Sequence, residues 1–136
     1  KIKGACHCGA IHYEADYDAT RIFICHCRDC QILSGSAFRT ATRVEPSKFK
    51  ITQGTPKFYD KTADSGATRR MAFCGDCGTP ICSLPSDPTK QNSYVSLRVS
   101  SSQDFSKMKL TGEIWCASRV SWLAPIDGAI QFPKQP

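Results

Sequence analysis

The sequence predicts one mainly β domain of antiparallel sheets, with one or two short helices, stapled together by metal ions. Three observations support this prediction. The chain has 136 residues, a length that suits a single domain over residues 1–136. Its apolar segments are short, rich in β-branched and aromatic residues, and interrupted by Gly, Pro, Asp and Ser. Most of its nine cysteines fall into three tight clusters.

The expected elements follow one another along the chain. Residues 10–15 alternate apolar and polar side chains, residues 21–25 form an apolar run, and residues 37–44 alternate until Pro46. Residues 49–52 and 56–61, joined through Gln53 and Gly54, predict a hairpin. Further strands are expected at residues 68–73, 80–84, 94–99 and 110–116. The best helical candidate spans residues 28–34 and ends at Gly35.

The charge and hydropathy of the chain disfavour two classes of partner. The formal net charge is +6, but the basic residues are scattered and form no tract of five or more. A nucleic-acid binder is therefore not expected. No apolar run approaches the ~18–20 residues of a membrane span, and the first residues lack a signal peptide's apolar stretch. We expect a cytoplasmic protein with no nucleic-acid or membrane partner; the oligomeric state is left open.

Two of the cysteine clusters predict a closed metal site. In a reducing compartment these cysteines do not favour a disulfide framework. The segment Cys74-Gly75-Asp76-Cys77-Gly78 has the form of a zinc knuckle, which supplies two of the four ligands that zinc prefers. Cys6 and Cys8, also followed by a glycine, are the natural second pair. These four thiolates are expected to hold a structural zinc that supports folding in so small a chain.

The middle cluster predicts a different kind of site. Cys25, Cys27 and Cys30 lie within six residues and have no fourth cysteine beside them in the sequence. Three protein ligands and an open position are typical of a catalytic zinc. A rival interpretation fills the fourth position and makes this site structural too. The candidates for that fourth ligand are Cys82, His26 and His7.

The clusters, their order and their neighbours resemble the glutathione-dependent formaldehyde-activating enzyme family, also called the centromere protein V family. The resemblance covers nearly the whole chain. It rests on Gly4-Ala5-Cys6-His7-Cys8-Gly9-Ala10-Ile11-His12-Tyr13, Cys25-His26-Cys27-Arg28-Asp29-Cys30-Gln31 with Ser34-Gly35-Ser36-Ala37-Phe38, Phe73-Cys74-Gly75-Asp76-Cys77-Gly78-Thr79-Pro80-Ile81, and Glu113-Ile114-Trp115 with Trp122. The segment Ser96-Leu97-Arg98-Val99-Ser100-Ser101 departs from it, because many members carry Gly-x-Leu-Asp there.

The resemblance implies an Mss4-like (β-tent) fold and two zinc ions per chain. Cys6, Cys8, Cys74 and Cys77 match the structural ligands, and Cys25, Cys27 and Cys30 match the catalytic ones. It implies a carbon–sulfur lyase that joins formaldehyde and glutathione to S-(hydroxymethyl)glutathione, so the expected partner is a small-molecule substrate with glutathione as the candidate thiol. The alternatives are a zinc-dependent hydrolase of imines or related small molecules, and a non-catalytic zinc-stabilised binding module.

Three residues after the middle cluster are candidates for contact with substrate. Ser34 and Ser36 are expected to contact a sulfur or the substrate, and capping of the helix and turn explains them equally well. Arg39 is a candidate partner for a carboxylate of an acidic substrate, and its alternative is an exposed strand residue. Asp29, inside the ligand loop, is expected to cap that loop or to relay a proton.

Overall fold

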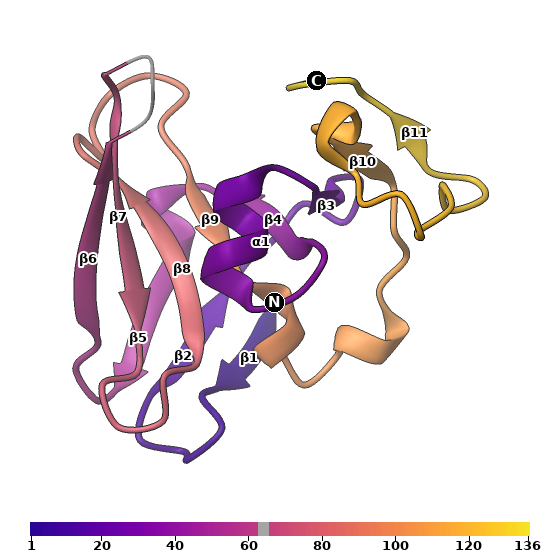
Figure 1. Ribbon diagram of the computed structural model, residues 1–136. Coiled ribbons are helices and arrows are strands. Elements are labelled where there is room, and N and C mark those ends of the chain that lie inside the picture. Colours follow the sequence, from indigo (N-terminus) through magenta and orange to yellow (C-terminus); the bar gives the residue numbers. More distant parts are fainter. Residues whose placement is uncertain (63–65) are drawn as a thin grey trace.

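The computed structural model describes residues 1–62 and 66–136, and it contains two sheets. The small sheet has the order β1-β2-β5, and its strands are β1 (Ile2–Ala5), β2 (His12–Ala15) and β5 (Phe49–Gln53). The large sheet has the order β11-β10-β3-β4-β9-β8-β7-β6. Its strands are β3 (Ile22–Cys25), β4 (Arg39–Val44), β6 (Lys57–Thr62), β7 (Thr68–Phe73), β8 (Pro80–Pro85), β9 (Val95–Leu97), β10 (Gly112–Ile114) and β11 (Ile130–Gln131). Figure 1 shows the two sheets facing each other.

The mainly β expectation is confirmed, and antiparallel pairing dominates both sheets. The exception is β10, which pairs in parallel with both β3 and β11. The helical content of the described residues is one α-helix, α1 (Arg28–Ser34), together with short 3₁₀ turns. These turns are η1 (Pro46–Lys48), η2 (Val99–Ser101), η3 (Phe105–Lys107) and η4 (Cys116–Ser118). No helix within the described residues has both the length and the apolar character needed to cross a membrane.

The core lies between the small sheet and one face of the large sheet. Its fully buried side chains include Tyr13 from the small sheet and Ile81 and Leu97 from the large sheet. Gly4 lies opposite Tyr13 in the β1–β2 pair, and a Cβ at Gly4 would come within 2.3 Å of the tyrosine ring. The Tyr13 hydroxyl reaches Ser101 Oγ at 2.8 Å. Glycine at position 4 therefore makes room for the aromatic ring that ties the small sheet to η2.

The predicted hairpin of residues 49–61 is wrong. Its first strand, β5, pairs with β2 in the small sheet, whereas its second strand, β6, pairs with β7 in the large sheet. Gly54 lies close to the Ala10 carbonyl, where a Cβ would approach the oxygen to 2.2 Å, and Gln53 Nε2 donates to Gly9 O at 3.2 Å. These contacts hold the connecting segment against the β1–β2 turn, so the chain passes from one sheet to the other.

The helix forms where the sequence predicts it. Cys27 precedes α1 as its N-cap, and its Sγ accepts a hydrogen bond from the Cys30 amide at 3.4 Å. Gly35 ends the helix in the left-handed conformation at φ 67°, and its amide donates to Gln31 O and Ile32 O. Figure 1 shows α1 in front of β4 and β9, on the side of the large sheet that faces away from the small sheet.

Candidate functional site

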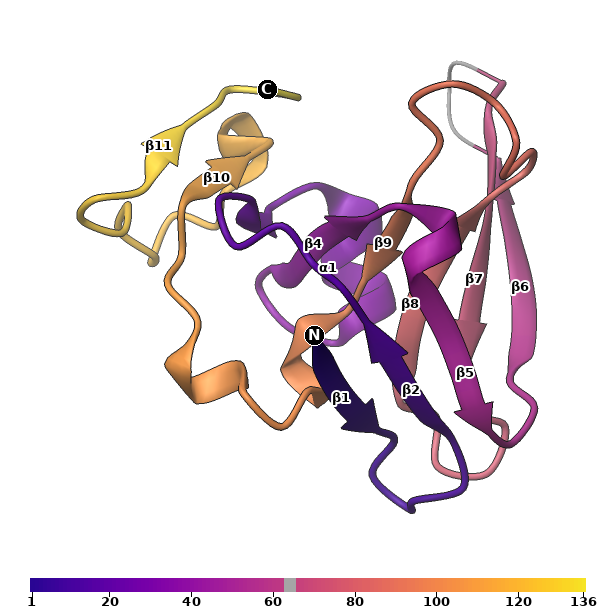
Figure 2. The same ribbon diagram turned by 180° about the vertical axis from the view of Figure 1, so that it is seen from behind.

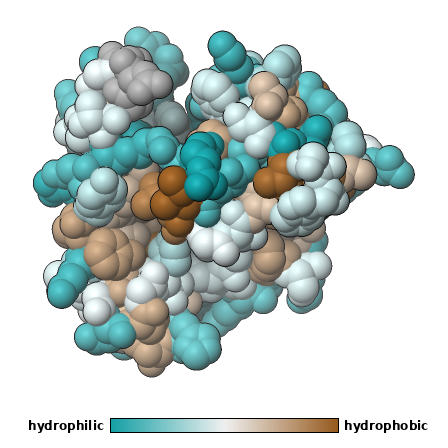
Figure 3. Space-filling model, in the orientation of Figure 1, coloured by the Kyte–Doolittle hydropathy of each residue, from teal (hydrophilic) through white to brown (hydrophobic). Residues whose placement is uncertain are grey.

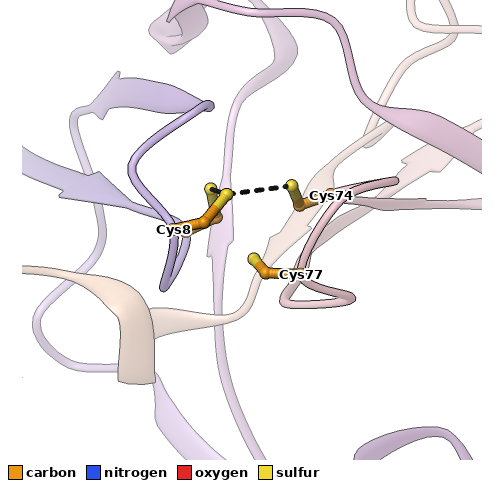
Figure 4. A group of neighbouring side chains, drawn as sticks. Cys8, Cys74 and Cys77 are labelled. Carbon is orange, nitrogen blue, oxygen red and sulfur yellow. Dashed lines mark hydrogen bonds between the residues drawn. The ribbon is translucent and has the colours of Figure 1, made fainter.

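Four cysteines from two turns meet at one end of the molecule. Cys6 and Cys8 lie between β1 and β2, and Cys74 and Cys77 lie between β7 and β8, so each sheet contributes one pair. Figures 1 and 2 both show these two turns side by side. All four Sγ atoms lie within 4.8 Å of one another, and Figure 4 shows Cys8 facing Cys74 and Cys77.

The sulfur separations fit a tetrahedral metal ion. The Sγ atoms of Cys6 and Cys8 are 3.7 Å apart, and those of Cys8 and Cys74 are 3.8 Å apart. Sulfurs at ~2.3 Å from a tetrahedral zinc ion lie about 3.8 Å from one another. These two separations match a tetrahedral ion, and the four-thiol group could hold a metal ion.

The two turns share two backbone features although their cysteine spacings differ. In each turn the amide of the first cysteine donates to the carbonyl five residues later, at 3.0 Å. A glycine follows the second cysteine in each turn, and both glycines have a left-handed φ, 81° at Gly9 and 80° at Gly78. This conformation carries little steric cost for glycine. The two glycines that the sequence places after each pair are therefore part of the fold of the site.

The second group is the three-cysteine site, formed by Cys25, Cys27 and Cys30. Their Sγ atoms also lie within 4.8 Å of one another. Cys25 is the last residue of β3, Cys27 is the N-cap of α1, and Cys30 lies in the first turn of that helix. Cys25 and Cys30 are buried, and Cys27 is half-buried. The end of β3, an interior strand of the large sheet, and the start of α1 thus bring three thiols to one point.

The proposed fourth ligands do not join this group within the described part of the chain. His26 lies between two of the cysteines, but its ring is fully buried on the opposite side of β3, against Phe38 and Glu113. Cys82 pairs with Leu97 and packs into the core between the sheets. His7 lies in the Cys6–Cys8 turn, where its amide donates to Thr79 Oγ1 at 3.0 Å. The three-cysteine site therefore keeps one position free of protein ligands among these candidates.

The three thiols differ in how readily they give up a proton. Hydrogen bonds from Cys25 and Cys30 lower the pKa of Cys27 to about 2. The hydrogen bond to Cys27, that to Cys30 and burial raise the pKa of Cys25. The thiolate form is therefore favoured at Cys27 relative to Cys25, and metal ligation requires deprotonated sulfur.

The candidate residues after the cluster differ in where they lie. Ser34 Oγ donates to Phe38 O at 3.3 Å and accepts from the Ser36 amide at 3.2 Å, so Ser34 caps the end of α1. Ser36 is exposed. Arg39 lies directly opposite Cys25 in the β3–β4 pair and is half-buried rather than exposed. Asp29 forms an ion pair with Lys61, with Nζ 2.9 Å from Oδ2.

A buried hydrogen-bond network lies behind the loop of residues 25–30, the ligand loop, and the sequence analysis did not identify it. Glu113 is fully buried, and its Oε1 lies 2.7 Å from His26 Nε2. Its Oε2 accepts from the Ile126 amide at 2.8 Å and from Gln131 Nε2 at 2.6 Å. Although burial raises it, these hydrogen bonds and the nearby Arg119 guanidinium lower the pKa of Glu113 to about 2. The only signal in the sequence is the Glu113-Ile114-Trp115 segment, whose partners are far away along the chain.

Gln31 reinforces the same connection from the helix. Its Nε2 donates to His26 O at 3.0 Å and to Ser118 O at 3.2 Å. The ligand loop is thus held by α1 on one side and by the chain after β10 on the other. The partners of His26 and Gln31 in these hydrogen bonds are a buried carboxylate and backbone carbonyls. They therefore restrain the loop that carries the three sulfurs.

Comparison with known proteins agrees with this arrangement. The model of the glutathione-dependent formaldehyde-activating enzyme family matches residues 1–118. The chain belongs to this family. An uncharacterized lyase of Schizosaccharomyces pombe is 29% identical over 81 residues, which cover 60% of this chain and 56% of that relative. A Rhodobacter sphaeroides protein of known crystal structure shares the fold, with a TM-score of 0.58, 18% identity and coverage of 96% of this chain and 98% of that one. This likeness agrees with the Mss4-like architecture expected of the formaldehyde-activating family.

Proposed function

We propose that this chain is a zinc-dependent carbon–sulfur lyase that joins a small aldehyde to a thiol, with formaldehyde and glutathione as its substrates. Membership of the formaldehyde-activating family and the name of the lyase relative support an enzyme of this type. The observation that carries the proposal is the three-cysteine site, a rigid group of three sulfurs without a fourth protein ligand among the described residues. The four-cysteine site of the same chain differs from it, because four sulfurs fill all the positions of a tetrahedral ion.

The two sites have separate tasks in this proposal. The four-cysteine site holds the small and large sheets together through one zinc ion and takes no part in the reaction. The three-cysteine site presents Cys25, Cys27 and Cys30 as ligands to a second zinc ion. When bound there, zinc supplies an open position that can hold a thiolate or polarise a carbonyl oxygen.

The reaction itself needs no redox partner. The thiol sulfur forms a bond to the aldehyde carbon, and the proton lost from the thiol ends on the aldehyde oxygen. The reverse reaction breaks the carbon–sulfur bond and returns that proton to sulfur. The protein's contribution is to hold the three ligand sulfurs in place, through Gln31 on the helix side and through Glu113 behind His26.

The test is the exchange rate between free formaldehyde and its glutathione adduct, measured by exchange NMR with ¹³C-formaldehyde. The zinc-loaded wild type is expected to accelerate exchange at least tenfold over the spontaneous reaction. Cys27→Ala is expected to return the rate to the spontaneous value. Cys82→Ala removes a buried cysteine outside both sites and is expected to keep the wild-type rate. A fully loaded wild type that does not exceed the spontaneous rate would overturn the proposal.

A further inference from the structure

One face of the large sheet gathers positive charge beside the three-cysteine site. Directly opposed residues of antiparallel strands share a face, and so do alternate residues along a strand. Arg39 lies opposite Cys25, and four residues further along β4, on the same face, Arg43 lies opposite Ser96 of β9. The same face continues through Ser83 of β8.

The contacts of the next strands extend this face. Arg69 of β7 donates to Ser83 Oγ at 2.8 Å, and Lys61 of β6 lies opposite Arg69. Arg98, which follows β9, donates to Ser96 Oγ at 2.5 Å and to Met71 Sδ at 3.6 Å. We call this set the cationic face; its members are Arg39, Arg43, Lys61, Arg69 and Arg98. In the orientation of Figure 3, hydrophilic surface extends from the side of β6 and β7 to the centre of the molecule.

The arginines of the cationic face lack acidic partners. Lys61 pairs with Asp29, but within residues 1–62 and 66–136 none of the four arginines forms an ion pair with a carboxylate. Arg43 and Arg69 instead lie on the Tyr94 ring, at 4.1 and 4.4 Å from its centroid. Arg39 Nε is buried and has no hydrogen-bond partner. Arg69 and Arg98 donate to neutral acceptors on Ser83, Tyr94 and Ser96, so their positive charges are not neutralised by a carboxylate among the described residues.

Arg98 is a buried member of the cationic face, with only 4% of its surface exposed. Burial and the neighbouring Arg39 guanidinium lower the pKa of Arg98 to about 9. A buried cation is costly unless an anion offsets it. Cys30 of the three-cysteine site and the core residue Cys82 both interact electrostatically with Arg98, and Cys30 also interacts with Arg39.

The thiolates of the three-cysteine site cannot neutralise the positive charge of the whole cationic face once a metal is bound. Three thiolates and one zinc ion carry a net charge of about −1, following the formal charges of sulfur and metal. Four arginines without carboxylate partners exceed that charge.

We propose that the cationic face is an oxyanion subsite, which binds a carboxylate or phosphate group of the same small molecule whose reacting end lies at the three-cysteine site. This inference rests on the proposed function for the position of the reacting end. The arginine side chains supply paired N–H donors that match the two oxygens of such a group. Two open hollows of about 680 and 700 Å³ share Arg43 and Tyr94 at the end of this face, but no cysteine of either site lines them.

Calorimetric titration of the zinc-loaded protein at low salt tests the subsite. The probes are S-methylglutathione, which keeps both carboxylates but has no free thiol, its dimethyl ester, and inorganic phosphate. We expect S-methylglutathione or phosphate to bind. If the ligand group is a carboxylate, the dimethyl ester is expected to bind at least tenfold more weakly than S-methylglutathione. Binding of the first indicates a carboxylate ligand, and binding of phosphate alone indicates a phosphate ligand; either supports the subsite.

Neighbouring arginines on β7 provide a matched pair of variants. Arg69→Gln removes a member of the cationic face and is expected to weaken binding at least tenfold. Arg70 points to the other face and pairs with Asp60 at 2.9 Å, so Arg70→Gln is expected to bind like the wild type. Arg39→Gln is expected to weaken binding as Arg69→Gln does, and its Nε has no hydrogen bond to lose. Binding of neither probe, or equal binding by the Arg69 and Arg70 variants, would overturn the subsite.

The exchange assay separates this inference from the proposed function. If the wild type accelerates exchange and Arg69→Gln leaves the KM for glutathione unchanged, the subsite is refuted and the lyase proposal stands. If S-methylglutathione binds in a manner that depends on Arg69 but exchange stays at the spontaneous rate, the subsite stands and the lyase proposal fails.

Discussion

Replacing Glu113 with Gln tests the buried network that supports the ligand loop. The carboxylate accepts hydrogen bonds from four donors, on His26, Arg119, Ile126 and Gln131. An amide of the same shape keeps one oxygen and turns an NH₂ group toward donors that need an acceptor. At least one buried donor then loses its partner, which costs about 1–3 kcal/mol for each group left unsatisfied.

The pKa of Glu113 gives a second measure of the same quantity. Its fall from 4.5 to about 2 corresponds to about 3 kcal/mol in favour of the ionised form in the folded state. We therefore expect Glu113→Gln to lower the free energy of unfolding at pH 7 by about 3 kcal/mol. The zinc-loaded proteins are compared by urea unfolding, followed by circular dichroism.

Glu14→Gln is the matched control for this experiment. Glu14 is a partly exposed surface residue that pairs with Lys3 at 3.6 Å, and loss of such a pair costs about 0–1 kcal/mol. If Glu113→Gln is no more destabilising than Glu14→Gln, the buried carboxylate does not support the ligand loop in the way we describe.

The pH dependence follows from the sign of the same shift. The folded-state pKa lies below the ordinary value, so the stabilisation is complete above about pH 5 and is lost as the pH falls toward 2. The difference in unfolding free energy between wild type and Glu113→Gln is expected to shrink by about 1 kcal/mol between pH 7 and pH 3.5. A constant difference over this range would contradict the assignment of the shift to Glu113.

Three further substitutions test the frame around the sites. Gly4→Ala places a methyl group within 2.3 Å of the Tyr13 ring, so we expect a loss of about 1–3 kcal/mol in urea unfolding, as for other overpacked sites. Cys82→Ala removes a core thiol outside both sulfur groups; zinc content by elemental analysis is expected to stay at the wild-type value, with a loss of about 1 kcal/mol in stability. Cys74→Ala breaks the four-cysteine site, and we expect its circular dichroism spectrum to be that of an unfolded chain. The reason is that binding of a structural zinc contributes about 10–16 kcal/mol to folding, which is comparable to the whole stability of a domain. A zinc-free but folded Cys74→Ala protein would show that the sheets do not need this site.

Much of the fold was predictable because its signals are local. The helix of residues 28–34 depends on its own start and on Gly35, and alternation of apolar side chains marks strands such as β2 and β4. The pairing of β5 and β6 was not predictable in this way. The Gln53-Gly54 pair favours a hairpin, but the contact of Gly54 with Ala10 comes from a distant turn and sends the next strand to the other sheet.

The two sulfur groups were predictable because ligand spacing is itself a local signal. The absence of His26 and Cys82 from the three-cysteine site was not predictable, since it depends on the buried contacts that each side chain makes elsewhere in the fold. The cationic face was not predictable from the sequence either. Arg39, Arg69 and Arg98 are scattered along the chain, and only the register of β4, β7 and β9 brings them to one side of the sheet.

The central claim is that the three-cysteine site holds its own zinc ion and is separable from the fold. Zinc per chain, measured by elemental analysis together with the thermal midpoint, tests this claim most directly. We expect two zinc ions in the wild type, and one in a Cys27→Ala protein that keeps the circular dichroism spectrum and cooperative unfolding of the wild type. A Cys27→Ala protein that unfolds, or that still binds two zinc ions, would contradict it.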